Sequence, residues 1–148
     1  MIGGKTGHKG FQVREVPAPQ FVDALAKHFE SAQIIKAPEW ADLVKTGFLQ
    51  QMPPTRSNWW YVRAASIARQ VYMNSNASVS GLVFRYGANQ NAGVTPKHHE
   101  EASRKIVRVI LQQLEKAGLV VVKENKGRAL TPKGYKLLDQ IANESAKQ

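Results

Sequence analysis

The clearest pattern of hydrophobic and polar positions lies between Asn58 and Tyr72, a stretch that contains no glycine or proline. Asn58 is a suitable N-cap residue, and the stretch predicts a helix of about four turns. Two adjacent stripes at helical spacing are apolar or aromatic: Trp60, Ala64, Ile67 and Val71, then Tyr61, Ala65, Ala68 and Tyr72. This face is wider than that of an ordinary surface helix. We therefore expect the helix at the centre of the domain, packed on two sides.

The remaining face of this helix carries polar and basic residues: Trp59, Arg63, Ser66 and Gln70, with Arg69 on its flank. No acidic residue occurs between Asp42 and Glu100, so a carboxylate partner nearby in sequence is excluded. The two arginines either pair with a distant carboxylate, such as Glu39 or Glu115, or they contact an external anion. We favour the external anion.

The N-terminal half of the chain predicts further helices around this centre. Gln20 to Ser31 has an apolar face at helical spacing, and a short helix is expected from Pro38, ending at Gly47. Val79 to Tyr86 fits a helix or a strand, and we favour a helix. Gly87–Gly93 is polar and uncharged and predicts a loop, after which Thr95-Pro96 opens a further helical stretch.

The C-terminal half shows the order of elements that is typical of a winged helix. Ser103–Ala117 predicts a helix that ends at Gly118, and a strand follows over residues 119–123. A turn at residues 124–127 and a returning strand at residues 128–130 complete a hairpin. Thr131-Pro132 then caps and starts a final helix. This pattern indicates the fold and does not by itself separate DNA, RNA and protein partners.

The expected fold class is therefore mainly α: a winged-helix-like helical bundle around a central helix, with one small β-hairpin wing. We expect a flexible basic arm over residues 1–10 and a single domain over residues 11–148. The arm, with Gly4-Lys5-Thr6, lacks the first glycine of a phosphate-binding loop, so it is either a phosphate-seeking tail or disordered. The helix of residues 103–117 stands in the position of the recognition helix. Its outward face carries Arg104, Lys105, Arg108 and Gln112, and Lys126, Gly127 and Arg128 form the wing tip.

The chain has a net charge of +10 over 148 residues, and this charge indicates what kind of partner the protein binds. Between Thr55 and Lys136 there are fourteen basic and four acidic residues, which accounts for the whole excess. A sequence pI near 10.0 with the excess confined to one region is typical of a nucleic-acid-binding protein. An anionic membrane is the rival, but it requires a basic helix with a free apolar face, and the apolar faces here are assigned to a core.

Composition and motifs also exclude several functions. The absence of cysteine rules out disulfides and thiolate metal sites, and no signal-peptide pattern or apolar run of membrane-spanning length occurs. We expect an intracellular protein. His98-His99 would diverge by about 100° on a helix, which makes a poor chelate. Paired carboxylates and nucleophile–base sets are missing, so we expect no enzyme, no metal, no cofactor and no small-molecule substrate.

The segment Asn58–Arg69 resembles the ribosomal protein S19e family, the small-subunit protein of eukaryotes and archaea. Further matching segments lie in family order between about Phe11 and Ala142: Pro38-Glu39-Trp40, Tyr86-Gly87, Val94–Pro96, Leu111–Glu115 and Arg128–Gly134. The resemblance implies a helical, winged-helix-like protein on the head of the small subunit, bound to small-subunit ribosomal RNA beside neighbouring ribosomal proteins. It also implies a cytoplasmic location on the ribosome and, in eukaryotes, a nucleolar assembly stage and a role in maturing the 3′ side of that RNA.

The family's RNA-facing basic residues match this sequence at Arg63, Arg69 and Arg108. Three departures from the family pattern are visible: Gly87–Gly93 lacks the usual arginines, Asn74–Ser80 is less glycine-rich, and the arm is longer. The expected RNA-binding set is Arg63, Arg69, Arg108, Trp59, Arg104, Lys105, Lys126 and Arg128. Trp59 either stacks on a base or packs within the domain, while Arg104 and Lys105 either contact phosphates or form a solvated face. The alternative functions are a DNA-binding winged-helix transcriptional regulator and a protein-interaction domain.

Overall fold

The computed structural model describes residues 13–43, 58–74, 77–90, 98–100, 102–123 and 127–146. These form the following elements in chain order: the 3-10 helix η2 (Val13–Glu15), α1 (Ala18–Ala32), the 3-10 helix η3 (Glu39–Leu43), α2 (Trp59–Met73), α3 (Val79–Arg85), β1 (Ala88–Gln90), β2 (His98–Glu100), α4 (Arg104–Lys116), β3 (Val120–Lys123), β4 (Gly127–Leu130) and α5 (Pro132–Ala146). The expected arm, residues 1–10, lies outside the described residues.

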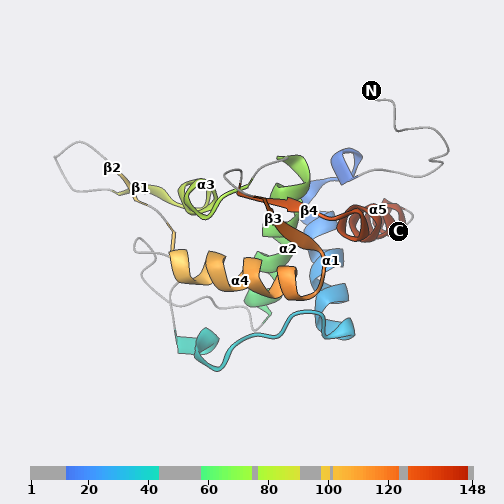
Figure 1. Ribbon diagram of the computed structural model, residues 1–148, viewed down its shortest axis with the longest axis horizontal. Helices are drawn as coiled ribbons and strands as arrows, with labels where there is room; N and C mark the ends of the chain where they lie inside the picture. Colours follow the sequence, from blue (N-terminus) through green and yellow to red (C-terminus); the bar gives the residue numbers. More distant parts are fainter. Residues whose placement is uncertain are drawn as a thin grey trace.

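Helix α2 is the centre of the molecule, as its sequence pattern predicted. Figure 1 shows it between α1 on one side and α4 on the other. Trp60, Ala64, Ile67 and Val71 are at most 1% exposed, and no residue of α2 is classed as exposed. Asn58 occupies the N-cap position, but its side chain makes no capping hydrogen bond; its carbonyl accepts from the Val62 amide. Packing rather than capping therefore defines where this helix lies.

The winged-helix pattern is confirmed in the C-terminal half. Strands β3 and β4 pair antiparallel, with Val120 opposite Leu130 and Lys123 opposite Gly127. Ala77, between α2 and α3, forms an isolated antiparallel bridge with Arg128 at the edge of the wing. The Thr131 side chain accepts a hydrogen bond from the Gly134 amide at 3.1 Å and caps α5. Helices α2, α3 and α4 with this wing make the mainly α, winged-helix-like fold.

The segment after α3 differs from the prediction. Residues 88–90 form strand β1, which pairs antiparallel with β2 at residues 98–100, so the structure has a second strand pair besides the wing. We had predicted a loop at Gly87–Gly93 and a helical start around His98-His99. Figure 1 shows β1 and β2 extending beyond α3, at the opposite end of the molecule from α5. Three-residue strands have too little periodicity to be recognised in a polar sequence, and their pairing is a long-range event.

The remaining elements match their predicted type with small shifts of boundary. Val79–Arg85 is a helix, capped by the Ser78 hydroxyl, which accepts from the Gly81 amide at 3.0 Å. The short helix expected from Pro38 is a 3-10 helix, η3. Its Trp40 ring packs edge-on against Trp60, with centroids 5.4 Å apart. The outer helices α1 and α5 contact each other and complete the core around α2.

Candidate nucleic-acid interface

Arg63 lies half-buried on α2, on the side that faces the end of α3. Its guanidinium carbon is 4.5 Å from the centroid of the Tyr86 ring, a cation–π contact. The Tyr86 hydroxyl shares a hydrogen bond of 2.5 Å with Ser66, one turn along α2 from Arg63. Tyr86 is therefore held between these two residues, and its ring supports the arginine from one side.

The Arg63 guanidinium is partly buried and has no negatively charged partner among the described residues. Burial lowers its pKa, an effect that the nearby Tyr86 partly offsets. Its buried Nη1 has no hydrogen-bond partner among the described residues. Burial raises the pKa of Tyr86, whereas the Ser66 hydrogen bond and the charges of Arg63, Arg85 and Arg69 lower it. A buried charge without a counter-ion is costly, so this site favours binding of an anion.

Arg69 lies further along α2, close enough to lower the pKa of Tyr86, and is also half-buried. Its Nε is buried and lacks a hydrogen-bond partner within the described ranges. In this part of the chain no ion pair joins Arg63 or Arg69 to a carboxylate. The described structure therefore does not support pairing of these arginines with a distant carboxylate such as Glu39 or Glu115.

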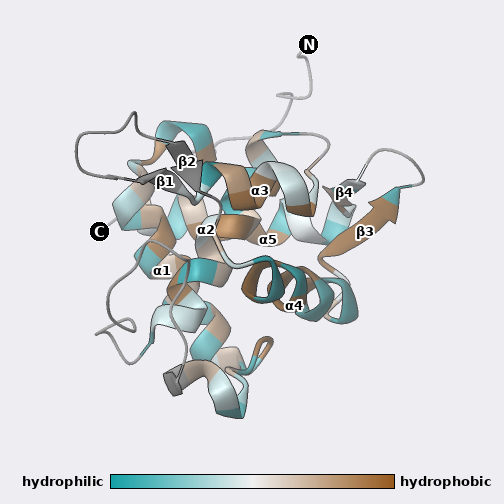
Figure 2. Cartoon of the chain, turned by 90° about the vertical axis from the view of Figure 1, so that its left-hand side faces the viewer, coloured by the Kyte–Doolittle hydropathy of each residue, from teal (hydrophilic) through white to brown (hydrophobic). Residues whose placement is uncertain are grey.

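Helix α4 presents a separate basic face. Arg104, Lys105 and Arg108 are all exposed, as predicted, and the opposite side carries the buried Ile106 and Ile110. Figure 2 shows this division as a hydrophilic and a hydrophobic side of α4. The Lys105 ammonium lies 4.7 Å from the centroid of the Trp40 ring. The Arg104 guanidinium donates to the Ser80 hydroxyl at 3.5 Å. Both side chains thus have protein contacts as well as access to a ligand.

Of the two basic residues predicted at the wing tip, the structure describes Arg128. Arg128 lies at the start of β4, where its amide donates to the Ala77 carbonyl at 2.6 Å. Its side chain is half-buried, and its Nε has no hydrogen-bond partner among the residues described. Lys126, the other predicted wing residue, lies outside the described residues. Because of this backbone hydrogen bond to Ala77, Arg128 lies close to the start of α3.

Trp59 and Gln70 do not lie on an open face, and this part of the prediction was wrong. Each is only 8% exposed, and the Trp59 ring packs edge-on against Trp60 with centroids 5.5 Å apart. The helical wheel had assigned them to the side of the arginines, but α2 is surrounded by neighbours on nearly every side. Trp59 packs within its own domain and offers little surface to a base.

Sequence reasoning missed three features of this region. Tyr86 was predicted only as the end of a helix, although its ring supports Arg63. Phe84 and Arg85 are exposed on α3, with Phe84 at 59% exposure. Their exposure could have been predicted, because both lie off the helical stripe formed by Val79, Leu82 and Val83. The contact of Lys105 with Trp40 joins elements far apart in sequence, and no local pattern could have indicated it.

The described residues form neither a metal site nor a membrane span. No cluster of three or more histidine, aspartate or glutamate side chains suitable for holding a metal ion occurs there. None of the described helices is long and apolar enough to cross a membrane.

The fold and the charged surface together define a class: a small winged-helix-like protein whose basic side chains gather on α2, α4 and the wing. Comparison with known proteins gives the family. The profile described as Ribosomal protein S19e matches residues 12–148, and the chain belongs to this family. The family consists of structural, non-enzymatic ribosomal proteins.

Curated relatives agree with this assignment. The chain is 42% identical over 135 residues to the small ribosomal subunit protein eS19 of Entamoeba histolytica, covering 91% of this chain and 86% of the relative. It is 38% identical over 133 residues to eS19B of Schizosaccharomyces pombe, covering 90% and 93%. It is 40% identical over 130 residues to eS19 of Oryza sativa, covering 88% and 89%. The resemblance predicted from short segments is thus confirmed over nearly the whole chain.

Proposed function

We propose that this protein is a structural component of the small ribosomal subunit that binds small-subunit ribosomal RNA in the subunit head. Its binding surface consists of Arg63 and Arg69 on α2, Arg104, Lys105 and Arg108 on α4, and the wing with Arg128 and Lys126. The single observation that carries the proposal is the pair of half-buried guanidiniums on α2 without a carboxylate partner among the described residues. RNA phosphates are the anions that would complete them.

The two helices have different roles in this proposal. Arg63 is held in place by Tyr86 and loses little side-chain freedom on binding, so it acts as a preorganised phosphate clamp. The basic side chains of α4 are exposed, so they add charge attraction to the RNA. The preorganised contact at Arg63 suits a protein that RNA folds around during assembly.

The proposal extends to the process in which such a component acts. Binding in the head makes the protein necessary for assembly of the small subunit and for maturation of the 3′ side of its RNA. Neighbouring proteins of the head are its further partners. The expected location is the cytoplasmic ribosome, with a nucleolar stage in a eukaryotic cell.

Sucrose-gradient sedimentation at low and high salt tests this function. We expect the protein to migrate with small subunits through the high-salt wash, and Arg63→Gln to reduce its incorporation about tenfold, the effect of losing one well-formed contact worth about 1.4 kcal/mol. Arg108→Glu should weaken incorporation without changing the fold, because Arg108 is exposed on α4.

Lys27→Gln is the matched control, since Lys27 is exposed on α1 and lies outside the proposed surface. Circular dichroism of each variant separates lost binding from lost structure. Wild-type protein that stays at the top of the gradient under both conditions would contradict the ribosomal function. Binding to duplex DNA in a subsequent assay would then favour a transcriptional regulator.

A further inference from the structure

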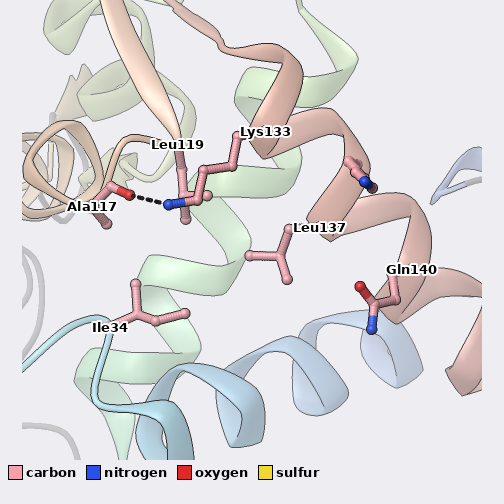
Figure 3. A pocket seen from close by; sticks show the side chains of 7 residues that line it. Ile34, Ala117, Leu119, Lys133, Leu137 and Gln140 are labelled. Carbon is pink, nitrogen blue, oxygen red and sulfur yellow. Dashed lines mark hydrogen bonds between the residues drawn. The ribbon is translucent and has the colours of Figure 1, made fainter.

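An open groove lies on a part of the molecule that the RNA-binding surface does not use. It has a volume of about 450 Å³ and runs between the end of α1, the end of α4 and the first half of α5. Figure 3 shows Leu137 and Ile34 approaching from opposite sides of this groove. The following described residues line it: Ile34, Ala117, Leu119, Lys133, Lys136, Leu137 and Gln140.

The groove combines an apolar floor with a basic rim. Leu119 is buried, and Ile34 and Leu137 are half-buried, so their side chains form a surface that another apolar group can cover. Lys133 and Lys136 are exposed at the rim. The Lys133 ammonium donates to the Ala117 carbonyl at 3.2 Å, which fixes one positive charge beside the apolar floor. No carboxylate occurs among the described lining residues, so the occupant must bring its own.

The chemistry of the groove favours a polypeptide over RNA. Unpaired bases are held mainly by stacking on aromatic or arginine side chains. Among the described lining residues there is no aromatic ring and no arginine. Aliphatic side chains with two flanking lysines instead match a peptide that carries an apolar residue and nearby carboxylates.

The chain itself does not supply such a segment from its longer undescribed stretches. Residues 1–12 contain no aspartate or glutamate, and neither do residues 44–57. The acidic η3 segment is already in use, because Trp40 packs on Trp60. Charge complementarity therefore assigns the occupant to a different protein.

We propose that this groove docks an acidic segment of a neighbouring protein in the small subunit. An apolar side chain of that segment enters between Ile34 and Leu137, and its flanking carboxylates pair with Lys133 and Lys136. The inference rests on the proposed function, because the assembled subunit supplies the neighbour.

Photo-cross-linking in assembled subunits tests the docking. Gln140 is replaced by p-benzoylphenylalanine, subunits are purified on a sucrose gradient and irradiated, and the product is sequenced by mass spectrometry. We expect one cross-linked ribosomal protein segment that has an apolar residue with aspartate or glutamate within a few positions. Adding Lys136→Glu should lower the yield about threefold or more, and Lys136→Arg should preserve it.

Lys123→Glu is the matched control, since Lys123 is exposed on β3 and does not line the groove. A cross-link to RNA, to this chain itself or to a second copy would overturn the inference. So would the absence of any product, or a yield that Lys136→Glu leaves unchanged. Co-sedimentation of the cross-linker variant is read in the same gradient, so a wrong groove assignment is distinguished from failure of the ribosomal function.

Discussion

At the scale of the single residue, Gly118, before β3, and Gly127, at the start of β4, differ in how much room they leave for a side chain. Both have positive φ, 82° at Gly118 and 78° at Gly127. A Cβ atom at Gly118 would find only ordinary contacts, with the Lys133 ammonium at 3.7 Å. A Cβ atom at Gly127 would lie 2.4 Å from the Ala77 carbonyl oxygen. Gly127 is needed because the wing passes so close to the segment before α3.

We predict that Gly127→Ala lowers the free energy of unfolding by about 3 kcal/mol or more, because backbone strain and a backbone clash add. Gly118→Ala has the strain alone and should cost about 1 kcal/mol. Urea unfolding of the two variants measures the difference. Equal losses would mean that Ala77 moves away freely and that the bridge between Ala77 and Arg128 contributes little.

Residue identity predicted only part of the candidate site. Arg63 and Arg69 stood out because no acidic residue lies near them in sequence, and the structure shows no ion pair for them in its described part. Trp59 was placed with them by helical geometry, yet it is buried. The angle around a helix says which residues share a side. It does not say which neighbours cover that side.

At the scale of the element, α4 does more than present a basic face. Gln113 accepts a hydrogen bond from the Trp60 indole at 3.0 Å and donates to the Lys36 carbonyl at 2.8 Å. One side chain on α4 therefore links the central helix to the segment between α1 and η3. Trp60 is 1% exposed, so its indole N–H has no access to water as a substitute.

We predict that Gln113→Ala lowers the free energy of unfolding by about 2 kcal/mol, since it leaves a buried donor unpaired. Gln112→Ala is the control on the same helix, because Gln112 is exposed, and it should change stability by less than about 0.5 kcal/mol. Thermal unfolding followed by tryptophan fluorescence measures both. A loss in the control as large as in Gln113→Ala would point to helix propensity rather than to the link.

Element type was predictable where the apolar pattern was long, as in α2, α4 and α5. It failed for β1 and β2, because these strands are three residues each and polar. Their type depends on pairing with each other across residues 91–97, which local sequence does not express.

At the scale of the whole molecule, the net positive charge sets how the proposed affinity for RNA depends on salt. The excess of +10 lies within one region of the chain, and the fold distributes its described basic residues over α2, α3, α4, the wing and the start of α5. Seven side chains are proposed to contact phosphates: Arg63, Arg69, Arg104, Lys105, Arg108, Lys126 and Arg128. Each contact releases counterions, so affinity must fall as salt rises.

We predict that the logarithm of the affinity for small-subunit RNA falls with the logarithm of salt concentration with a slope of about −5 to −6, the value for seven phosphate contacts. Filter binding across salt concentrations measures the slope, and Arg108→Gln should reduce its magnitude by about 1. Lys27→Gln serves as the control and should leave it unchanged. A slope near zero would contradict the phosphate contacts and favour a protein-interaction domain.

The sequence by itself determined the central helix, the winged-helix order of elements and the basic region, because apolar periodicity, turn residues and charge are local properties of the chain. Its short motifs were also sufficient to indicate the family. Only the tertiary structure decided that Trp59 is buried, that Tyr86 supports Arg63, that residues 88–90 and 98–100 pair, and that a groove opens beside α5. Each of these depends on contacts between residues distant in sequence, and such contacts arise from packing of the whole chain.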